Sequence, residues 1–322
     1  MKPYLFQLPD WLPVAAGRPI FSYGVMLGVS FIIGWSLCVH LCRKDGMDAK
    51  VASTGMFVIV LSSLMGARLF HFLADTSAKP LTFANFFKFD EGGLVAYGGI
   101  LGGLIGIFTY MRVKKYDGWA YWDNAAPGVA LGLGITRIGC FLFGCDYGIA
   151  STSKWAVRFP RWEDPDVIGW IKGSAPAYTA HYSVPTNGGM HLPYDSVALF
   201  SHSVHPSQLY ESLVGFAGFA LCLLWHPAKR FHGQVMLVFM GYYAVARFLL
   251  ERLRGDADRG DDVAAGLSTS QLTSLLILAA AAILWWWQGR KGLYALPTGA
   301  LEPAFAPAAK LPSGRRGGRK RR

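Results

Sequence analysis

Two arginines lie inside stretches of this chain that are otherwise apolar enough to span a lipid bilayer. Arg137 lies in APGVALGLGITRIGCFLFG, and Arg247 lies in VMLVFMGYYAVARFLLE. An arginine at the bilayer centre costs about 2.5 to 3.5 kcal/mol on insertion scales, so we expect each side chain to face a protein interior or a lipid head group. Guanidinium is planar, permanently charged and matched to phosphate. The two arginines therefore predict a site for a phospholipid head group.

Polar residues also open a later apolar stretch, in the segment HPSQLYE. Pro206 suits the first turn of a helix, and Ser207 can cap the unpaired N–H groups of that turn. Gln208 and Glu211 would then project polar groups into a helix bundle. Taken alone, the segment is interpreted as an N-terminal capping device.

The composition is typical of a polytopic membrane protein, because 52% of the residues are hydrophobic and only 16% are charged. A cleavable signal peptide is not expected near the N-terminus. We expect an all-α protein with seven transmembrane helices. The windows long enough for a span are 20–42, 53–74, 93–112, 124–145, 207–226, 233–252 and 267–288.

Basic residues between these windows predict the orientation of the chain. Lysines and arginines follow the first, third and fifth windows, and the tail 289–322 ends in KLPSGRRGGRKRR. Cytoplasmic connections carry an excess of such residues, so we expect the N-terminus outside and the C-terminus inside. Residues 1–19 then form an outer segment, and 20–288 form the seven-span unit. The tail is expected to attract anionic membrane lipids, and no nucleic acid partner is expected.

Two outer connections have unusual composition. Residues 149–206 form the longest connection, and their tryptophans and mixed charges favour a small folded extracytoplasmic cap with short strands. The loop after the sixth window holds Arg252, Arg254 and Arg259 on the side that basic residues usually avoid. Either these arginines have a function there, or neighbouring acidic residues neutralise them in a salt-bridged loop. Charge alone leaves both interpretations open.

Taken together, the motifs resemble those of the bacterial prolipoprotein diacylglyceryl transferases. HPSQLYE is similar to a hallmark segment of that family, and further landmarks follow the family's order over most of residues 20–288. The chain is therefore identified as a diverged member. The further landmarks are Tyr23-Gly24, GAR at 66–68, GGLVAYGGILGG, Asp123 with APG, RIGCFLFGCDYG from Arg137, Tyr243, RFLLERLRGD and LSTSQ.

The resemblance implies an enzyme of the bacterial inner membrane. It would move the diacylglyceryl group of phosphatidylglycerol onto the thiol of a lipobox cysteine in a preprolipoprotein, with glycerol phosphate as the leaving group. Negative charge then grows on phosphate in the transition state, which preorganised arginines in a water-poor site can stabilise. No cofactor or metal ion is expected, and the five cysteines show no paired CxxC spacing for structural zinc.

Matching the family motifs gives roles to individual residues. Arg137 and Arg247 become ligands of the head group, with Tyr23 and Tyr243 as hydrogen-bonding partners. Glu251 follows Arg247 by four residues, one helical turn, so it is expected to orient that guanidinium rather than to act as a general base.

Three further candidates have competing structural interpretations. Arg68 either binds the head group as well or pairs with a carboxylate such as Asp123 or Glu251. The glycines of GGLVAYGGILGG are expected to serve close helix packing more than lipid binding. Gly148 ends the RIGCFLFGCDYG motif and is expected to permit a turn out of the membrane and to line the substrate site.

One departure from the family concerns the base that would activate the thiol. The family motif has histidine where this chain has Tyr97. A tyrosine pKa of about 10, against about 6.5 for histidine, makes a poor base near neutral pH, so Tyr97 is expected to donate a hydrogen bond to phosphate. His202 and His205 are the candidates for a replacement base, and His205, Ser207 and Gln208 are expected to contact substrate.

A second departure replaces three polar family positions with Cys140, Phe143 and Cys145. Cys140 is expected to line the substrate site in place of an asparagine. The two cysteines could form a disulfide, supply a covalent catalytic thiol or simply pack, and packing is favoured because an unbroken helix does not bring them within bonding distance.

These departures keep two other functions open. A diverged paralogue could use the same lipid with a different acceptor. Alternatively, the chain could be a non-catalytic lipid-binding membrane protein.

Overall fold

The computed structural model describes residues 4–9, 11, 19–74, 82–87, 95–160, 176–177, 184–186, 189–191, 200–255 and 266–290. Most of these residues are helical. Six helices in this part of the chain are long and apolar enough to cross a membrane. They are α1 (Ser22–Lys44), α2 (Ala49–Ala74), α5 (Gly118–Phe143), α7 (Ser207–Trp225), α8 (Gln234–Leu250) and α9 (Thr269–Arg290).

One more long helix, α4 (Ala96–Lys114), coincides with the third predicted window but is not among the six. Its glycines add little hydropathy, and Arg112 and Lys114 occupy its last turn. The six helices confirm a mostly helical, polytopic membrane protein. Seven spans and the orientation remain predictions.

Shorter elements lie between and beyond these helices. Two antiparallel hairpins pair β1 with β2 and β3 with β4. The short elements are β1 (Tyr4–Gln7), β2 (Pro19–Phe21), α3 (Phe83–Phe86), β3 (Val184–Thr186), β4 (Gly189–His191) and the 3-10 turns η2 (His226–Ala228) and η3 (Glu251–Leu253).

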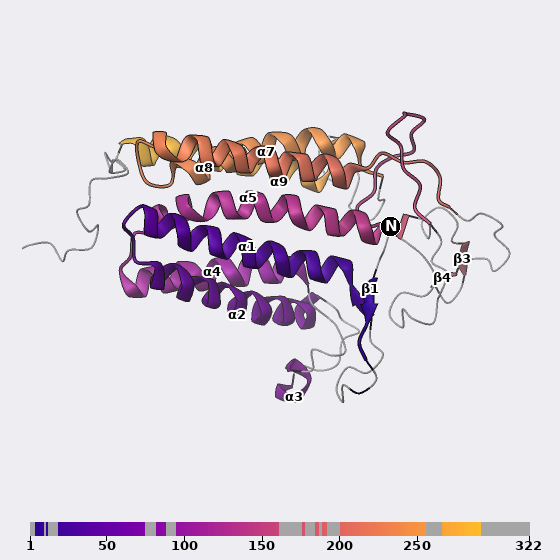
Figure 1. Ribbon diagram of the computed structural model, residues 1–322, viewed down its shortest axis with the longest axis horizontal. Coiled ribbons are helices and arrows are strands. Elements are labelled where there is room, and N and C mark those ends of the chain that lie inside the picture. The colour runs from indigo at the N-terminus through magenta and orange to yellow at the C-terminus, as the bar shows by residue number, and fades with distance from the viewer. Residues whose placement is uncertain are drawn as a thin grey trace, which may run out of the picture.

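Helix α5 lies at the centre of the bundle, between α1 and α7 (Figure 1). Helix α2 pairs with α4 on one side, and α8 packs against α7 and α9 on the other. The closest approaches depend on glycine. A Cβ atom at Gly128 in α5 would lie 2.7 Å from the carbonyl oxygen of Gly34 in α1, and one at Gly102 in α4 would lie 2.3 Å from the carbonyl oxygen of Ser62 in α2. The α4 glycines therefore serve close helix packing, as small residues do in membrane bundles.

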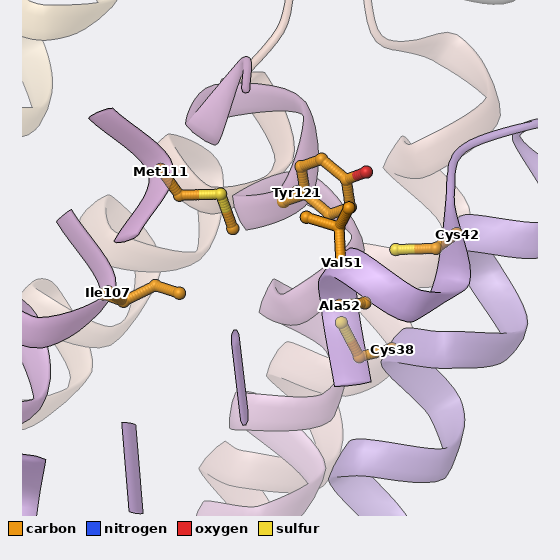
Figure 2. Packing of buried hydrophobic residues seen from close by; sticks show 7 residues of the cluster. All are labelled: Cys38, Cys42, Val51, Ala52, Ile107, Met111 and Tyr121. Carbon is orange, nitrogen blue, oxygen red and sulfur yellow. The ribbon is translucent and has the colours of Figure 1, made fainter. Parts of the chain in front are cut away.

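Apolar side chains fill the end of the bundle where α1 is joined to α2 (Figure 2). Helices α1, α2, α4 and α5 all contribute to this cluster, so it ties the α2–α4 pair to the central helices. Two of its members are cysteines with free thiols. The buried residues of the cluster are Cys38, Cys42, Val51, Ala52, Ile107, Met111 and Tyr121.

Polar groups fix the ends of the central helices. The Trp119 N–H donates to Asp117 at the start of α5 (3.1 Å), and the buried Asp123 accepts from the Gly233 and Val235 N–H groups at the start of α8 (both 2.8 Å). Helix α5 ends where Gly144 takes a left-handed conformation with φ of 85°. Asp123 thus joins two helices that are distant in sequence.

The prediction that Gly148 provides the turn after α5 is wrong, because Gly144 provides it. Gly148 instead lies between two backbone segments. Its N–H donates to the His205 carbonyl (3.0 Å), and a Cβ atom there would lie 2.6 Å from the carbonyl oxygens of both His205 and Leu253. Only glycine allows these segments to approach so closely.

The first and last residues of the long connection after α5 lie side by side. Ala150 and Val157 both pair with Val204, and Gly148 pairs with Arg254 after η3. Phe159 and Val204 are fully buried in a small apolar cluster over this end of the bundle. These pairings place the segments that precede α7 and follow α8 next to the end of α5.

Candidate functional site

Three arginines and three carboxylates form one ionic network where α5, α7 and α8 meet the segments beyond them. Their side chains are between 2% and 18% exposed, so the network is largely shielded from solvent. Buried ions are costly unless each is paired, and here the charges balance. The members are Arg137, Arg247 and Arg254 with Asp146, Glu211 and Glu251.

Arg137, in α5, bridges two carboxylates that lie in different elements. Its Nε lies 2.6 Å from Oε2 of Glu211 in α7, and its Nη1 lies 2.7 Å from Oδ2 of Asp146, just beyond the end of α5. The fork of the guanidinium is thereby held in a fixed plane. An anion that replaced or joined these carboxylates would meet preorganised donors.

Arg254 holds the same two carboxylates from the other side. Its Nη2 lies 2.5 Å from Oδ1 of Asp146, and its Nη1 lies 3.1 Å from Oε1 of Glu211. Sequence reasoning noticed the basic loop that contains Arg254 but did not place this residue in the site. Its described partners, Asp146 and Glu211, are remote in sequence. Arg254 is therefore paired within the network and not only with acidic residues of its own loop.

Arg247 pairs with Glu251, which directly follows the end of the same helix. Its Nη1 lies 2.5 Å from Oε2 of Glu251, and its Nη2 donates to the Ser270 hydroxyl at 3.0 Å. Ser268 donates to the other Glu251 oxygen at 2.9 Å. Because Arg247 Nη1 is also 3.9 Å from Glu211, it joins the Arg137 and Arg254 side of the network.

The HPSQLYE segment secures the turn after α5. Pro206 occupies the N-cap of α7, so the expected capping role of Ser207 is wrong: its hydroxyl donates to the Asp146 carbonyl at 2.6 Å. The Gln208 amide donates to the Cys145 carbonyl at 2.6 Å. These two bonds position Asp146, which explains why polar residues open an apolar helix.

His205 lies just before that helix and is partly buried. The Nδ1 atom of its imidazole ring lies 3.2 Å from the Tyr210 hydroxyl oxygen, within hydrogen-bonding distance. The structure therefore engages His205 with α7, beside the network and not within it.

The two tyrosines matched to the head-group site come from different helices, and both lie near Arg137. Tyr243 in α8 stacks on Phe239 and lies within electrostatic range of Arg137, Glu211 and Arg247. Tyr23, in the first turn of α1, is 38% exposed and lies within electrostatic range of Arg137.

Arg68 and Tyr97 lie on α2 and α4, two helices that contribute none of the six members of the network. Arg68 is buried and donates to the Asn85 and Phe86 carbonyls of α3, at 2.8 and 3.0 Å. Tyr97, at the start of α4, is 75% exposed. The two carboxylates weighed as partners for Arg68 are engaged elsewhere, Asp123 at the start of α8 and Glu251 with Arg247.

Cys140 and Cys145 are free thiols at the end of α5. Cys140 is buried, and its sulfur lies 3.9 Å from Arg137 Nη1. Together with Asp146 the cysteines form a group whose ligand atoms all lie within 4.8 Å of one another. Among the described residues, these three could hold a metal ion.

Comparison with known proteins identifies the scaffold that carries this network. Residues 12–287 match the family model described as prolipoprotein diacylglyceryl transferase. The chain belongs to this family. The matched range contains every member of the ionic network, together with Cys140 and Cys145, and excludes the basic tail.

Relatives in three bacteria are similar over most of their length. A Clostridium tetani protein is 30% identical over 85% of this chain and 93% of its own length, and a Thermus thermophilus protein is 29% identical over 79% and 88%. Both are named phosphatidylglycerol–prolipoprotein diacylglyceryl transferase. A Clostridium perfringens relative is 28% identical over 80% of this chain and 87% of its own length, and is named phosphatidylglycerol–prolipoprotein diacylglyceryl transferase 2. The family resemblance predicted from the motifs is thus confirmed.

Proposed function

We propose that this protein transfers the diacylglyceryl group of phosphatidylglycerol to the thiol of a lipobox cysteine in a preprolipoprotein. The observation that carries the proposal is the convergence of Arg137, Arg247 and Arg254 on one buried site. The names of relatives that align over most of the chain support it.

The reaction replaces one bond to a glyceryl carbon by another. The substrate sulfur forms a C–S bond while the C–O bond to phosphate breaks, and the bonding electrons stay on the phosphate oxygen. The thiol proton leaves with solvent or with glycerol phosphate. Arg137 and Arg254 are held by carboxylates on either side, so they can receive the growing phosphate charge without reorganising.

The ion pairs of the network explain how charged side chains are accommodated in a largely buried site. Glu211 and Asp146 balance the charge of the arginines. A phosphate that enters would share these donors, and Glu251 would keep Arg247 aligned through its 2.5 Å contact. Tyr243 and Tyr23 flank the network as further hydrogen-bonding groups.

For the membrane arrangement, we infer that α4 is a seventh span and that the ionic network faces the outer side of the bacterial inner membrane. Basic residues at the ends of α1, α4 and α9 support this assignment, since Arg43, Lys44, Arg112, Lys114 and Arg290 lie in last turns. Figure 1 places β1 and the β3–β4 hairpin together at the opposite end of the bundle. Secreted preproteins would then reach the site from that side.

Mass spectrometry of a lipobox peptide tests the proposal. The purified protein, incubated with phosphatidylglycerol and the peptide, should yield a diacylglyceryl adduct on the cysteine. Arg137→Ala and Arg254→Ala should each lower the rate by about 10²- to 10³-fold, because each removes a positioned charged donor. Arg158→Ala is the matched control, since Arg158 is exposed and donates to Ser203 away from the network.

The outcomes separate the rival functions. Lipid consumption without modification of the peptide would indicate a different acceptor. Bound lipid with no turnover against any thiol would indicate a lipid-binding protein and refute the transferase assignment.

A further inference from the structure

The chemistry of thiol activation is the unexplained part of the proposed function, on which this inference rests. The substrate sulfur must lose its proton, yet Tyr97 is 75% exposed and lies outside the ionic network. His205 is engaged with Tyr210. Two thiols, those of Cys140 and Cys145, lie beside the network next to the Asp146 carboxylate.

The backbone brings these three residues together. Helix α5 ends at Phe143, and the left-handed Gly144 reverses the chain, so that the Cys145 sulfur lies 3.8 Å from the Cys140 carbonyl oxygen. Asp146 is itself left-handed, with φ of 56°, and its Oδ2 lies 4.0 Å from the Cys145 sulfur. A spacing of five residues, which an unbroken helix would separate, thus forms a compact group.

The geometry points to a site for a zinc ion, or a similar thiophilic divalent cation, bound by Cys140, Cys145 and Asp146, with its fourth position open to the thiol of the incoming lipobox cysteine. Zinc bonds of about 2.3 Å to sulfur and about 2.0 to 2.2 Å to oxygen put tetrahedral ligand atoms about 3.3 to 3.8 Å apart. The ligand atoms here lie within 4.8 Å of one another, so small rotations of the side chains suffice. Three protein ligands and one open position are the pattern of catalytic zinc.

Charge and access both suit such an ion. Two thiolates, one carboxylate and a dication sum to −1, and Arg137 and Arg254 lie beside them to compensate. Asp146 contacts both of these arginines, so its carboxylate holds the proposed ion and the compensating charges together. Cys145 and Asp146 are only partly buried, which leaves an entrance.

The step that this ion supports is balanced. The substrate thiol binds as a thiolate and releases its proton to water, because coordination deprotonates a thiol. Its sulfur then forms the C–S bond as the C–O bond breaks toward phosphate. The product is a neutral thioether, which binds zinc more weakly and can leave.

Metal loading of the full-length protein tests the site without relying on turnover. After treatment with a chelator, the detergent-solubilised protein should take up one zinc or cobalt ion per chain, measured by elemental mass spectrometry. Cobalt should show sulfur-to-metal charge-transfer absorption and tetrahedral ligand-field bands. Cys140→Ser and Cys145→Ser should each weaken binding by about tenfold or more.

The chain supplies a matched control in a second cysteine pair. Cys38 and Cys42 are buried at the other end of the bundle, so Cys38→Ala and Cys42→Ala should leave metal binding unchanged. Loss of metal in these variants but not in Cys140→Ser would overturn the assignment.

A peptide titration distinguishes this inference from the proposed function. A lipobox peptide should change the cobalt spectrum, and its Cys→Ser analogue should not, whether or not transfer follows. A spectral change without any adduct would refute transfer but support the site. Full transfer by metal-free protein would overturn the site, and so would a Cys140–Cys145 disulfide, seen as a mass lower by two hydrogens and thiols that resist alkylation.

Discussion

Glu211 offers the sharpest test of the ionic network. It is 1% exposed and accepts contacts from Arg137 at 2.6 Å and Arg254 at 3.1 Å, with Arg247 at 3.9 Å. Glu211→Gln keeps the shape but removes the charge, which leaves three arginines against two carboxylates. Breaking a buried pair in this way costs about 3 to 5 kcal/mol, mostly because a charge stays buried and uncompensated.

Thermal unfolding in detergent measures this cost. We expect Glu211→Gln to lower Tm by about 5 to 10 °C, given shifts of a few degrees per kcal/mol in proteins of this size class. Asp48→Asn is the control, since Asp48 is exposed and an asparagine caps a helix as well as an aspartate does. Its Tm should change by no more than about 1 °C, in line with surface substitutions.

A lipid titration of the same variant separates electrostatics from general damage. The excess positive charge of Glu211→Gln should be compensated by an anionic head group, so phosphatidylglycerol should raise its Tm more than that of the parent protein. A neutral diacylglycerol should not. A Tm equal to that of the Asp48→Asn control, with no added response to lipid, would refute the reasoning about the network.

Three further predictions follow from packing, pH and exposure. Gly128→Leu should abolish folded protein by separating α1 from α5. Gly132→Ala is the control and should fold normally, because its Cβ atom would lie 3.7 Å from its nearest neighbour. Size-exclusion chromatography measures the folded protein, and equal profiles for the two variants would contradict the prediction. Burial raises the pKa of Asp117, but His232 and the backbone N–H groups of Trp119 and Ala120 together lower it more, so the net pKa is lowered. The stability that Asp117 contributes should be present above about pH 4, where the carboxyl ionises in the unfolded chain, and should be lost as the pH falls through the lower pKa of the folded state. Measured as Tm against pH, this loss of stability in acid should be absent from Asp117→Asn. Tyr97→Phe should change the transfer rate less than about threefold, because the hydroxyl lies outside the network, and a larger loss in the adduct assay would place it at the substrate.

Local patterns predicted the parts of the molecule that depend on neighbours in sequence. Apolar length located the six helices, and a spacing of four residues indicated the contact between Arg247 and Glu251. The predicted positions of the helix ends were less accurate. The fourth window began at residue 124, whereas α5 begins at Gly118, because Asp117 accepts the Trp119 N–H. A glycine directly after the apolar run could have identified Gly144 as the end of that helix.

Contacts between distant segments were beyond the reach of sequence patterns. Arg254 meets Asp146 and Glu211 only because the backbone near Gly148 pairs with the segments before α7 and after α8. Nothing in the spacing of these residues shows that pairing. The same holds for Ser207, whose hydroxyl bonds to a carbonyl 61 residues away instead of to its own helix.

The position of the network at helix ends follows from its charge. In the middle of a span, three arginines and three carboxylates would need partners from every facing helix. Near the ends of α5 and α8, the turn after Gly144 and the turn η3 add Asp146 and Arg254 without any loss of helical hydrogen bonds. Polar backbone outside helices is satisfied there because the segments 148–157 and 203–205 pair with each other. A buried, charge-balanced network of this kind is therefore best built where helices end.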